Sequence, residues 1–171
     1  MFGIRNLVPT IFMVILVVNC ANVASVEVGL NDEGLFRGVP GQFVIRVLKI
    51  EAKKDEAYSV IWEGSKLLTI PAHTSSFTSI TEQYVNIDPG SYKTFRITVD
   101  SLVYTKDATN AVLLYTTYQF DANAFSNIIF EADDEHKLVV NIASEQWFDM
   151  DSLKIKSGSA PFSGAKLSIY Y

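Results

Sequence analysis

Residues 92–104, YKTFRITVDSLVY, decide the fold, because they form the longest alternating segment of the chain. Apolar side chains occupy every second position, which is the period of a strand with one buried face. They fall at Phe95, Ile97 and Val99 and then, one residue out of phase, at Leu102 and Tyr104. A slip of one residue is typical of a β-bulge. We therefore predict one long strand with a bulge at Asp100-Ser101.

The same two-residue period continues on both sides of this segment, with turn signals about every ten residues. The other candidate strands are 26–30, 43–50, 58–62, 67–70, 80–87, 112–120, 128–130, 138–142 and 167–171. Glu63-Gly64-Ser65-Lys66 is interpreted as a hairpin turn, and only 143–150 favours a helical turn. The pattern predicts an all-β fold: an antiparallel β-sandwich of about seven to nine strands, formed by a single domain over residues 26–171.

The N-terminus predicts a secretory signal peptide. Arg5 is the only charged residue before an apolar run over 7–18, which is followed by small residues. A helix of that length spans about 18 Å, too short for a hydrocarbon core of about 30 Å. A short basic start, a short apolar core and small residues after it are typical of a signal peptide, and we assign it to residues 1–19.

The lone cysteine follows this run directly, in Leu16-Val17-Val18-Asn19-Cys20. These five residues resemble the lipobox of bacterial lipoproteins, in which the cysteine receives a diacylglyceryl group and becomes the first residue of the mature chain. Asn19 departs from the usual small residue, and spirochaete-type lipoboxes are more permissive at this position. The resemblance implies that acyl chains on Cys20, such as palmitate, hold the protein to the lipid bilayer.

The resemblance also implies a location. Residues 20–25 would be a lipidated tether, and Ala21 after the cysteine implies the outer membrane of the cell envelope, on its periplasmic or surface side. The alternative is ordinary signal cleavage after Ser25, because Val23-Ala24-Ser25 also places small residues at the right spacing. That cleavage would give a secreted domain.

A second resemblance lies in Ile87-Asp88-Pro89-Gly90-Ser91-Tyr92, where Pro-Gly-x-Tyr opens a strand. This turn resembles that of immunoglobulin-like and prealbumin-like bacterial sandwich modules. An uncharacterised family of bacterial lipoprotein domains resembles the chain over about residues 26–105. The resemblance implies an extracytoplasmic β-sandwich, and it carries over no catalytic residue.

Charge and cysteine content exclude several classes of protein. The chain has 14 Lys and Arg against 19 Asp and Glu, a net charge of −5, whereas nucleic-acid binding needs a basic face. A single cysteine cannot form an intramolecular disulfide or a cysteine-rich zinc site. We therefore expect no nucleic-acid partner.

No group of residues predicts catalysis. The two histidines, His73 and His136, lie in predicted loops outside any recognisable catalytic motif. The acidic segments 133–135 and 149–151 are interpreted as solvated turns rather than as metal sites. We therefore predict a protein that is not an enzyme and that carries neither a cofactor nor a metal ion.

The remaining candidates are aromatic. Trp147-Phe148 lies in an irregular segment, where an exposed pair could stack on a sugar or on a partner protein; the alternative is that Trp147 covers the open end of the sandwich. We predict a membrane-anchored, non-enzymatic binding module with a protein or carbohydrate partner. The alternative is a structural envelope or fimbria-like subunit that assembles by strand exchange through 26–30 or 167–171.

Overall fold

The structure is a computed structural model that describes residues 23–34 and 41–170. The predicted signal peptide over 1–19 and the predicted lipidation site at Cys20 lie outside the described residues. The strands are β1 (Ala24–Asp32), β2 (Gln42–Lys54), β3 (Ala57–Pro71), β4 (Thr74–Ser79), β5 (Val85–Ile87), β6 (Gly90–Lys106), β7 (Thr109–Leu114), β8 (Tyr118–Phe130), β9 (Glu135–Asn141), β10 (Phe148–Asp149), β11 (Lys154–Ile155) and β12 (Lys166–Ile169). The described helix is α1 (Ser144–Trp147), within the segment where one helical turn is predicted.

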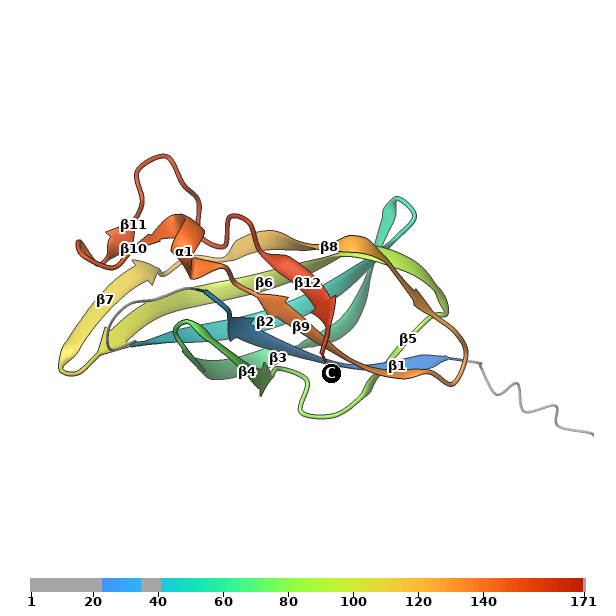
Figure 1. Cartoon of the computed structure of the whole chain (residues 1–171). Coiled ribbons are helices and arrows are strands. Elements are labelled where there is room, and N and C mark those ends of the chain that lie inside the picture. Colours follow the sequence, from blue (N-terminus) through green and yellow to red (C-terminus); the bar gives the residue numbers. More distant parts are fainter. Residues whose placement is uncertain (1–22, 35–40, 171) are drawn as a thin grey trace, which may run out of the picture.

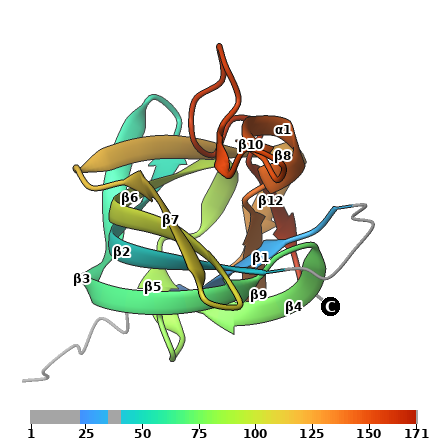
Figure 2. The same ribbon diagram turned by 90° about the vertical axis from the view of Figure 1, so that its left-hand side faces the viewer.

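Ten of these strands form one continuous sheet. Its order is β3-β2-β6-β8-β12-β9-β1-β4, with β5 paired to β1 and β7 paired to β6. Viewed along its length, the sheet curls around an interior until it is nearly barrel-like (Figure 2). The fold is therefore all-β as predicted, with more strands than expected. The predicted sandwich is not confirmed, because the ten strands belong to one curled sheet.

The prediction that the strands pair only antiparallel is wrong. β1 runs parallel to β9 from Ser25 to Asn31, and β12 runs parallel to β8 over two residue pairs. Each parallel pair joins strands separated by a long stretch of chain, as parallel pairing requires. Sequence periodicity shows which face of a strand is buried, but it does not show which strands are neighbours.

The bulge predicted in the longest strand is confirmed. In the ladder between β2 and β6, Arg46 pairs with Ser101 and Val47 pairs with Val99, so Asp100 is the extra residue. The predicted hairpin at 63–66 is wrong, because β3 runs straight through these residues. Its Gly64 and Ser65 form a second bulge in the pairing with β2.

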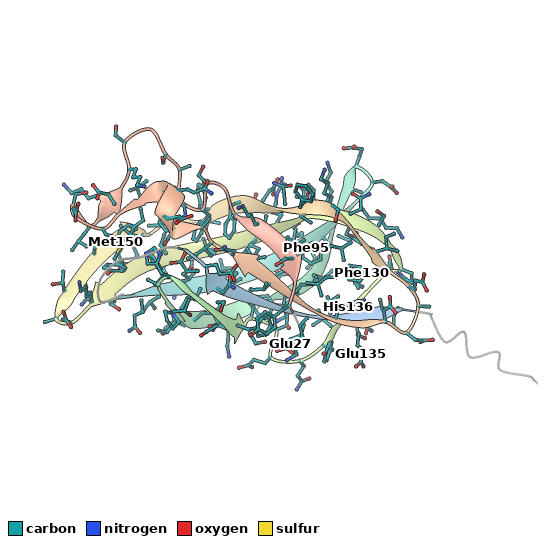
Figure 3. All side chains as sticks on the ribbon, in the orientation of Figure 1. Glu27, Phe95, Phe130, Glu135, His136 and Met150 are labelled. Atoms are coloured by element: carbon teal, nitrogen blue, oxygen red, sulfur yellow. The ribbon has the colours of Figure 1, made fainter. Side chains whose placement is uncertain are left out.

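The core is built from the inward-facing side chains of every long strand. Phe95 and Phe130 are buried inside the curled sheet, whereas Glu135 lies exposed at one end of it (Figure 3). β1 begins at this end, and α1, β10 and β11 lie at the opposite end (Figure 1). β1 therefore starts at one end of the fold, and the α1 segment closes the opposite end, which we call the distal end.

β1 starts earlier than predicted. Ala24 is fully buried and pairs with Ile87, and Ser25 donates its backbone N–H to the carbonyl of Asp134 at 2.8 Å. The carbonyl of Val23 accepts a hydrogen bond from Asp133 at 3.0 Å. Two residues assigned to the tether, Ala24 and Ser25, are therefore part of the sheet.

Tyr58, Arg96 and Asp121 form an ion-pair network on the outer face of the sheet. Arg96 donates to both carboxylate oxygens of Asp121, at 2.8 and 3.1 Å, and to the hydroxyl of Tyr58 at 3.0 Å. The Arg96 guanidinium also lies 3.9 Å from the centre of the Tyr58 ring. The hydrogen bonds from Arg96 hold the pKa of Asp121 below its ordinary value, against the opposing effect of burial.

This network predicts a small loss of stability in acid. Because the folded-state pKa of Asp121 is lowered, its contribution is present above the unfolded-state pKa of about 3.9 and is lost as the pH falls through the folded-state value. Asp121→Asn should therefore reduce the free energy of unfolding by less than about 1 kcal/mol at pH 7, since the pair is partly solvated. Thermal melts at pH 7 and in acid would test this. The difference in stability between Asp121→Asn and the wild type should vanish in acid. Asp151→Asn removes an exposed carboxylate and serves as the control. A difference between Asp121→Asn and the wild type that stays constant with pH would contradict this role of Asp121.

Candidate functional site

The sheet opens between β8 and β12. Their parallel ladder contains only Lys166 opposite Asn123 and Leu167 opposite Ala124. Beyond these pairs β12 continues along β9, while β8 continues along β6. Within residues 23–34 and 41–170, the facing edges of β8 over 125–130 and of β12 over 168–169 therefore have no strand partner.

A large bulge in β8 lies beside this opening. Thr94 of β6 pairs with Asn123, and the next pair is Tyr92 with Ile128, so residues 124–127 stand opposite Lys93 alone. Bulges redirect side chains out of the regular alternation. The Phe125 side chain is fully exposed, which is unusual for so large an apolar group.

The opening forms a groove of about 420 Å³. Its lining contains no charged side chain and consists of Ala124, Phe125, Ser126, Asn127, Ile128, Ile129, Leu167, Ser168 and Ile169. Ile128 and Leu167 are buried, while Ile129 keeps 66% of its surface exposed. We call this depression the β8–β12 groove. It combines an apolar surface with unpaired strand edges.

A second, polar depression of about 310 Å³ lies on the other side of the bulge. It is lined by Lys53, Asp55, Ser91, Lys93, Thr94 and Asn127, and we call it the Lys93 recess. Asn127 lines both depressions. The bulge therefore separates an apolar depression from a charged one.

The predicted ligand contacts lie elsewhere, at the distal end. Trp147 is fully buried and Phe148 is 3% exposed. The Trp147 ring lies 5.6 Å from that of Phe43 and 5.4 Å from that of Phe162, and its indole N–H donates to the carbonyl of Ile142 at 2.8 Å. Both rings close the core, as the alternative interpretation expects. The ligand-contact hypothesis is not supported, because neither ring offers a free face.

A buried carboxylate that the sequence pattern did not single out ties three segments together beside α1. Asp32 has no exposed surface and accepts hydrogen bonds from the backbone N–H of His73 and of Ser144, both at 2.9 Å. The Ser144 hydroxyl also donates to Asp32, at 2.7 Å. A catalytic relay would place an imidazole between serine and carboxylate, whereas here Ser144 contacts Asp32 directly and is itself buried. This cluster is therefore a structural junction.

The other predicted loop residues are not brought together into a site. The Nε2 atom of His136 lies 3.6 Å from a carboxylate oxygen of Asp134, and its ring packs on Phe130. Asp149 accepts a hydrogen bond from Ser152 within its own turn. Among the described residues, no three or more His, Cys, Asp or Glu side chains are grouped so that they could hold a metal ion.

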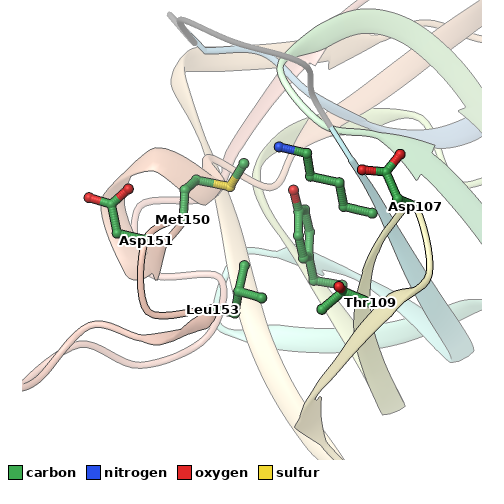
Figure 4. Close-up of a pocket in the computed structure, with 7 residues that line it drawn as sticks. Asp107, Thr109, Met150, Asp151 and Leu153 are labelled. Atoms are coloured by element: carbon green, nitrogen blue, oxygen red, sulfur yellow. The ribbon is translucent and has the colours of Figure 1, made fainter.

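An open cleft of about 430 Å³ lies between the β6–β7 turn and the β10–β11 segment (Figure 4). Its charged residues come from separate turns and have both signs: Lys106, Asp107 and Asp151. Met150 and Leu153 supply its apolar surface. Because these side chains do not share one chemistry, the β8–β12 groove is the stronger candidate.

Comparison of the chain with protein-family models, with curated proteins and with solved structures finds no match. Among the described residues, no helix has the length and apolar character needed to span a membrane.

Proposed function

We propose that this protein is a non-enzymatic binding module of the cell envelope. Acyl chains on Cys20 anchor it to the bilayer, in keeping with its resemblance to bacterial lipoproteins. Its β8–β12 groove binds an extended segment of a partner protein through the apolar side chains of that segment. The observation that carries this proposal is the opening of the sheet, where two unpaired strand edges flank an apolar groove beside the exposed Phe125.

The chemistry of the groove favours a protein segment over a carbohydrate. Unpaired backbone N–H and C=O groups along a strand edge are satisfied by an added strand, whose alternate side chains can fill an apolar depression. A sugar would need polar side chains and a flat aromatic platform. The exposed apolar side chains of the groove are Phe125 and Ile129, and its polar side chains carry no charge.

The start of β1 supports processing at Cys20 over cleavage after Ser25. Cleavage after Ser25 would remove the buried Ala24 and the hydrogen bonds that Val23 and Ser25 form with the 133–134 turn. Processing before Cys20 leaves the whole strand intact. Two or three acyl chains on Cys20 would then give an anchor much stronger than a single chain.

The anchoring proposal predicts the mass of the mature N-terminal peptide. In the native membrane fraction, this peptide should begin at Cys20 and carry diacylglycerol and an N-linked acyl chain. Cys20→Ser should prevent the modification and leave the protein unanchored. A mature chain that begins unmodified at Val26 would contradict the proposal.

The structural-subunit alternative receives less support. Both strands proposed for exchange are already paired within the same chain: β1 lies between β9 and the β4 and β5 strands, and β12 pairs with β9 over Lys166–Ile169 and with β8 at Lys166 and Leu167. Exchanging either strand would break these ladders. The open β8 edge offers pairing without that cost.

The binding proposal makes Phe125 the central contact. A random linear peptide library panned against the wild-type protein should enrich peptides that alternate apolar and polar residues. Phe125→Ser should weaken their binding about 30-fold, which corresponds to about 2 kcal/mol for a central aromatic contact. Because Phe125 is fully exposed, the melting temperature should not change.

Tyr115→Ser provides a matched control, since Tyr115 is an aromatic residue with 71% exposure outside the groove lining. This variant should bind the selected peptides as the wild type does. Equal binding by wild-type protein and Phe125→Ser would overturn the proposed site.

A further inference from the structure

The charged residues around the bulge are distributed unevenly along the groove. Lys93 lies opposite the bulge on β6, and Lys166 pairs with Asn123 where the bulge begins. At the other end of the exposed edge, Glu131 follows Phe130 directly. Outside the groove lining, two lysines therefore lie near its Asn123 end and an acidic residue follows its other end.

The two cations at the start of the bulge lack partners in the part of the chain that the structure describes. The ammonium of Lys53, the other lysine in the Lys93 recess, forms an ion pair with Glu56 at 3.0 Å. By contrast, neither Lys93 nor Lys166 forms a side-chain hydrogen bond or ion pair with any described residue. Asp55 is the carboxylate that lines the same recess as Lys93.

We infer that the segment bound in the β8–β12 groove carries an acidic group at the end that lies near Asn123, where Lys93 and Lys166 bind it. This inference rests on the proposed function and specifies the chemistry of the partner. The apolar side chains of the segment contact Phe125 and Ile129, while its carboxylate lies between the two ammonium groups. An acidic residue at the opposite end would meet Glu131 and be repelled.

The expected contribution of this charge pairing is moderate and depends on salt. Lys93 and Lys166 are both exposed, so water and ions screen their interaction with a carboxylate. Complementary charges at the edge of an interface act mainly on specificity and association rate. The two lysines should therefore determine which apolar segments bind, while the groove supplies most of the affinity.

Charge reversal tests the inference. We would pan the random peptide library against the wild-type protein and against the double variant Lys93→Glu, Lys166→Glu. The wild type should enrich peptides with an acidic residue at one end. The double variant should bind these peptides about 10-fold more weakly at low salt and should itself enrich peptides with a basic residue. Lys106→Glu with Lys154→Glu, two lysines that line neither depression, should behave as the wild type does.

The outcomes separate the inference from the proposed function. If the enriched peptides lose binding with Phe125→Ser but show no excess of acidic residues and bind the double variant as tightly as the wild type, the inference is overturned and the proposed groove stands. If no enriched peptide depends on Phe125, both are overturned. Melting temperatures of the variants would show that each is folded.

Discussion

Trp147→Ala should lower the free energy of unfolding by about 3–5 kcal/mol, the range for deleting a fully buried aromatic side chain. Trp147 has no exposed surface and packs against Phe43 and Phe162. Its loss would leave a cavity at the distal end of the core and would leave the carbonyl of Ile142 without the indole donor. Urea unfolding followed by circular dichroism would measure the effect.

Tyr115→Ala is the matched control, because this aromatic side chain is 71% exposed and its removal should change stability by less than about 0.5 kcal/mol. A loss below about 1 kcal/mol for Trp147→Ala would contradict the assignment of Trp147 to the core. It would reopen the interpretation of this residue as a ligand contact.

Asp32→Ala should have a comparable effect, a loss of about 3 kcal/mol or more. The substitution removes three hydrogen bonds to a buried carboxylate, each of the charge-assisted kind that contributes about 1.5–3 kcal/mol. The backbone N–H groups of His73 and Ser144 would remain buried without this acceptor. The junction between β1, the turn before β4 and α1 would therefore loosen.

Asp32→Asn should lose less stability than Asp32→Ala, because the amide keeps one acceptor oxygen. Some loss should remain, because the amide NH₂ group would face the donors that the second carboxylate oxygen now accepts from. Asp100→Ala is the control, since its ion pair with Arg46 lies at the surface and should contribute less than about 1 kcal/mol. Equal unfolding midpoints for Asp32→Ala and Asp100→Ala would show that the junction is not structural.

The sequence predicted a bulge where the bulge shifts the two-residue spacing of the apolar side chains. The bulge at Asp100 shifts the apolar positions by one residue and is visible as a slip between Val99 and Leu102. The larger bulge in β8 is not visible in this way. The buried residues of β8 stay in the same two-residue phase before and after the bulge: Phe120, Ala122, Ala124, Ile128 and Phe130. Periodicity alone therefore does not indicate that Phe125 lies in a bulge.

The arrangement of strands and the buried polar junction also escaped prediction, for physical reasons. Parallel pairing of β1 with β9 depends on contacts across more than half of the chain, which local patterns do not encode. Asp32 lies in an Asn-Asp-Glu-Gly stretch that favours a turn, yet distant donors at His73 and Ser144 make its burial favourable. The candidate groove arises from the same long-range pairing.

Backbone hydrogen exchange of the full mature chain tests the central claim most directly. Those amides of β8 over 125–129 and of β12 over 168–169 that face the opening should exchange rapidly in the free protein, because these edges lack strand partners within the described residues. Amides of the same strands that point toward β6 or β9 belong to those ladders and should exchange more slowly. On addition of a peptide selected by panning, protection should increase at these two edges and nowhere else. Protection at another face of the sheet, or none at the β8 edge while the peptide is bound, would contradict the account.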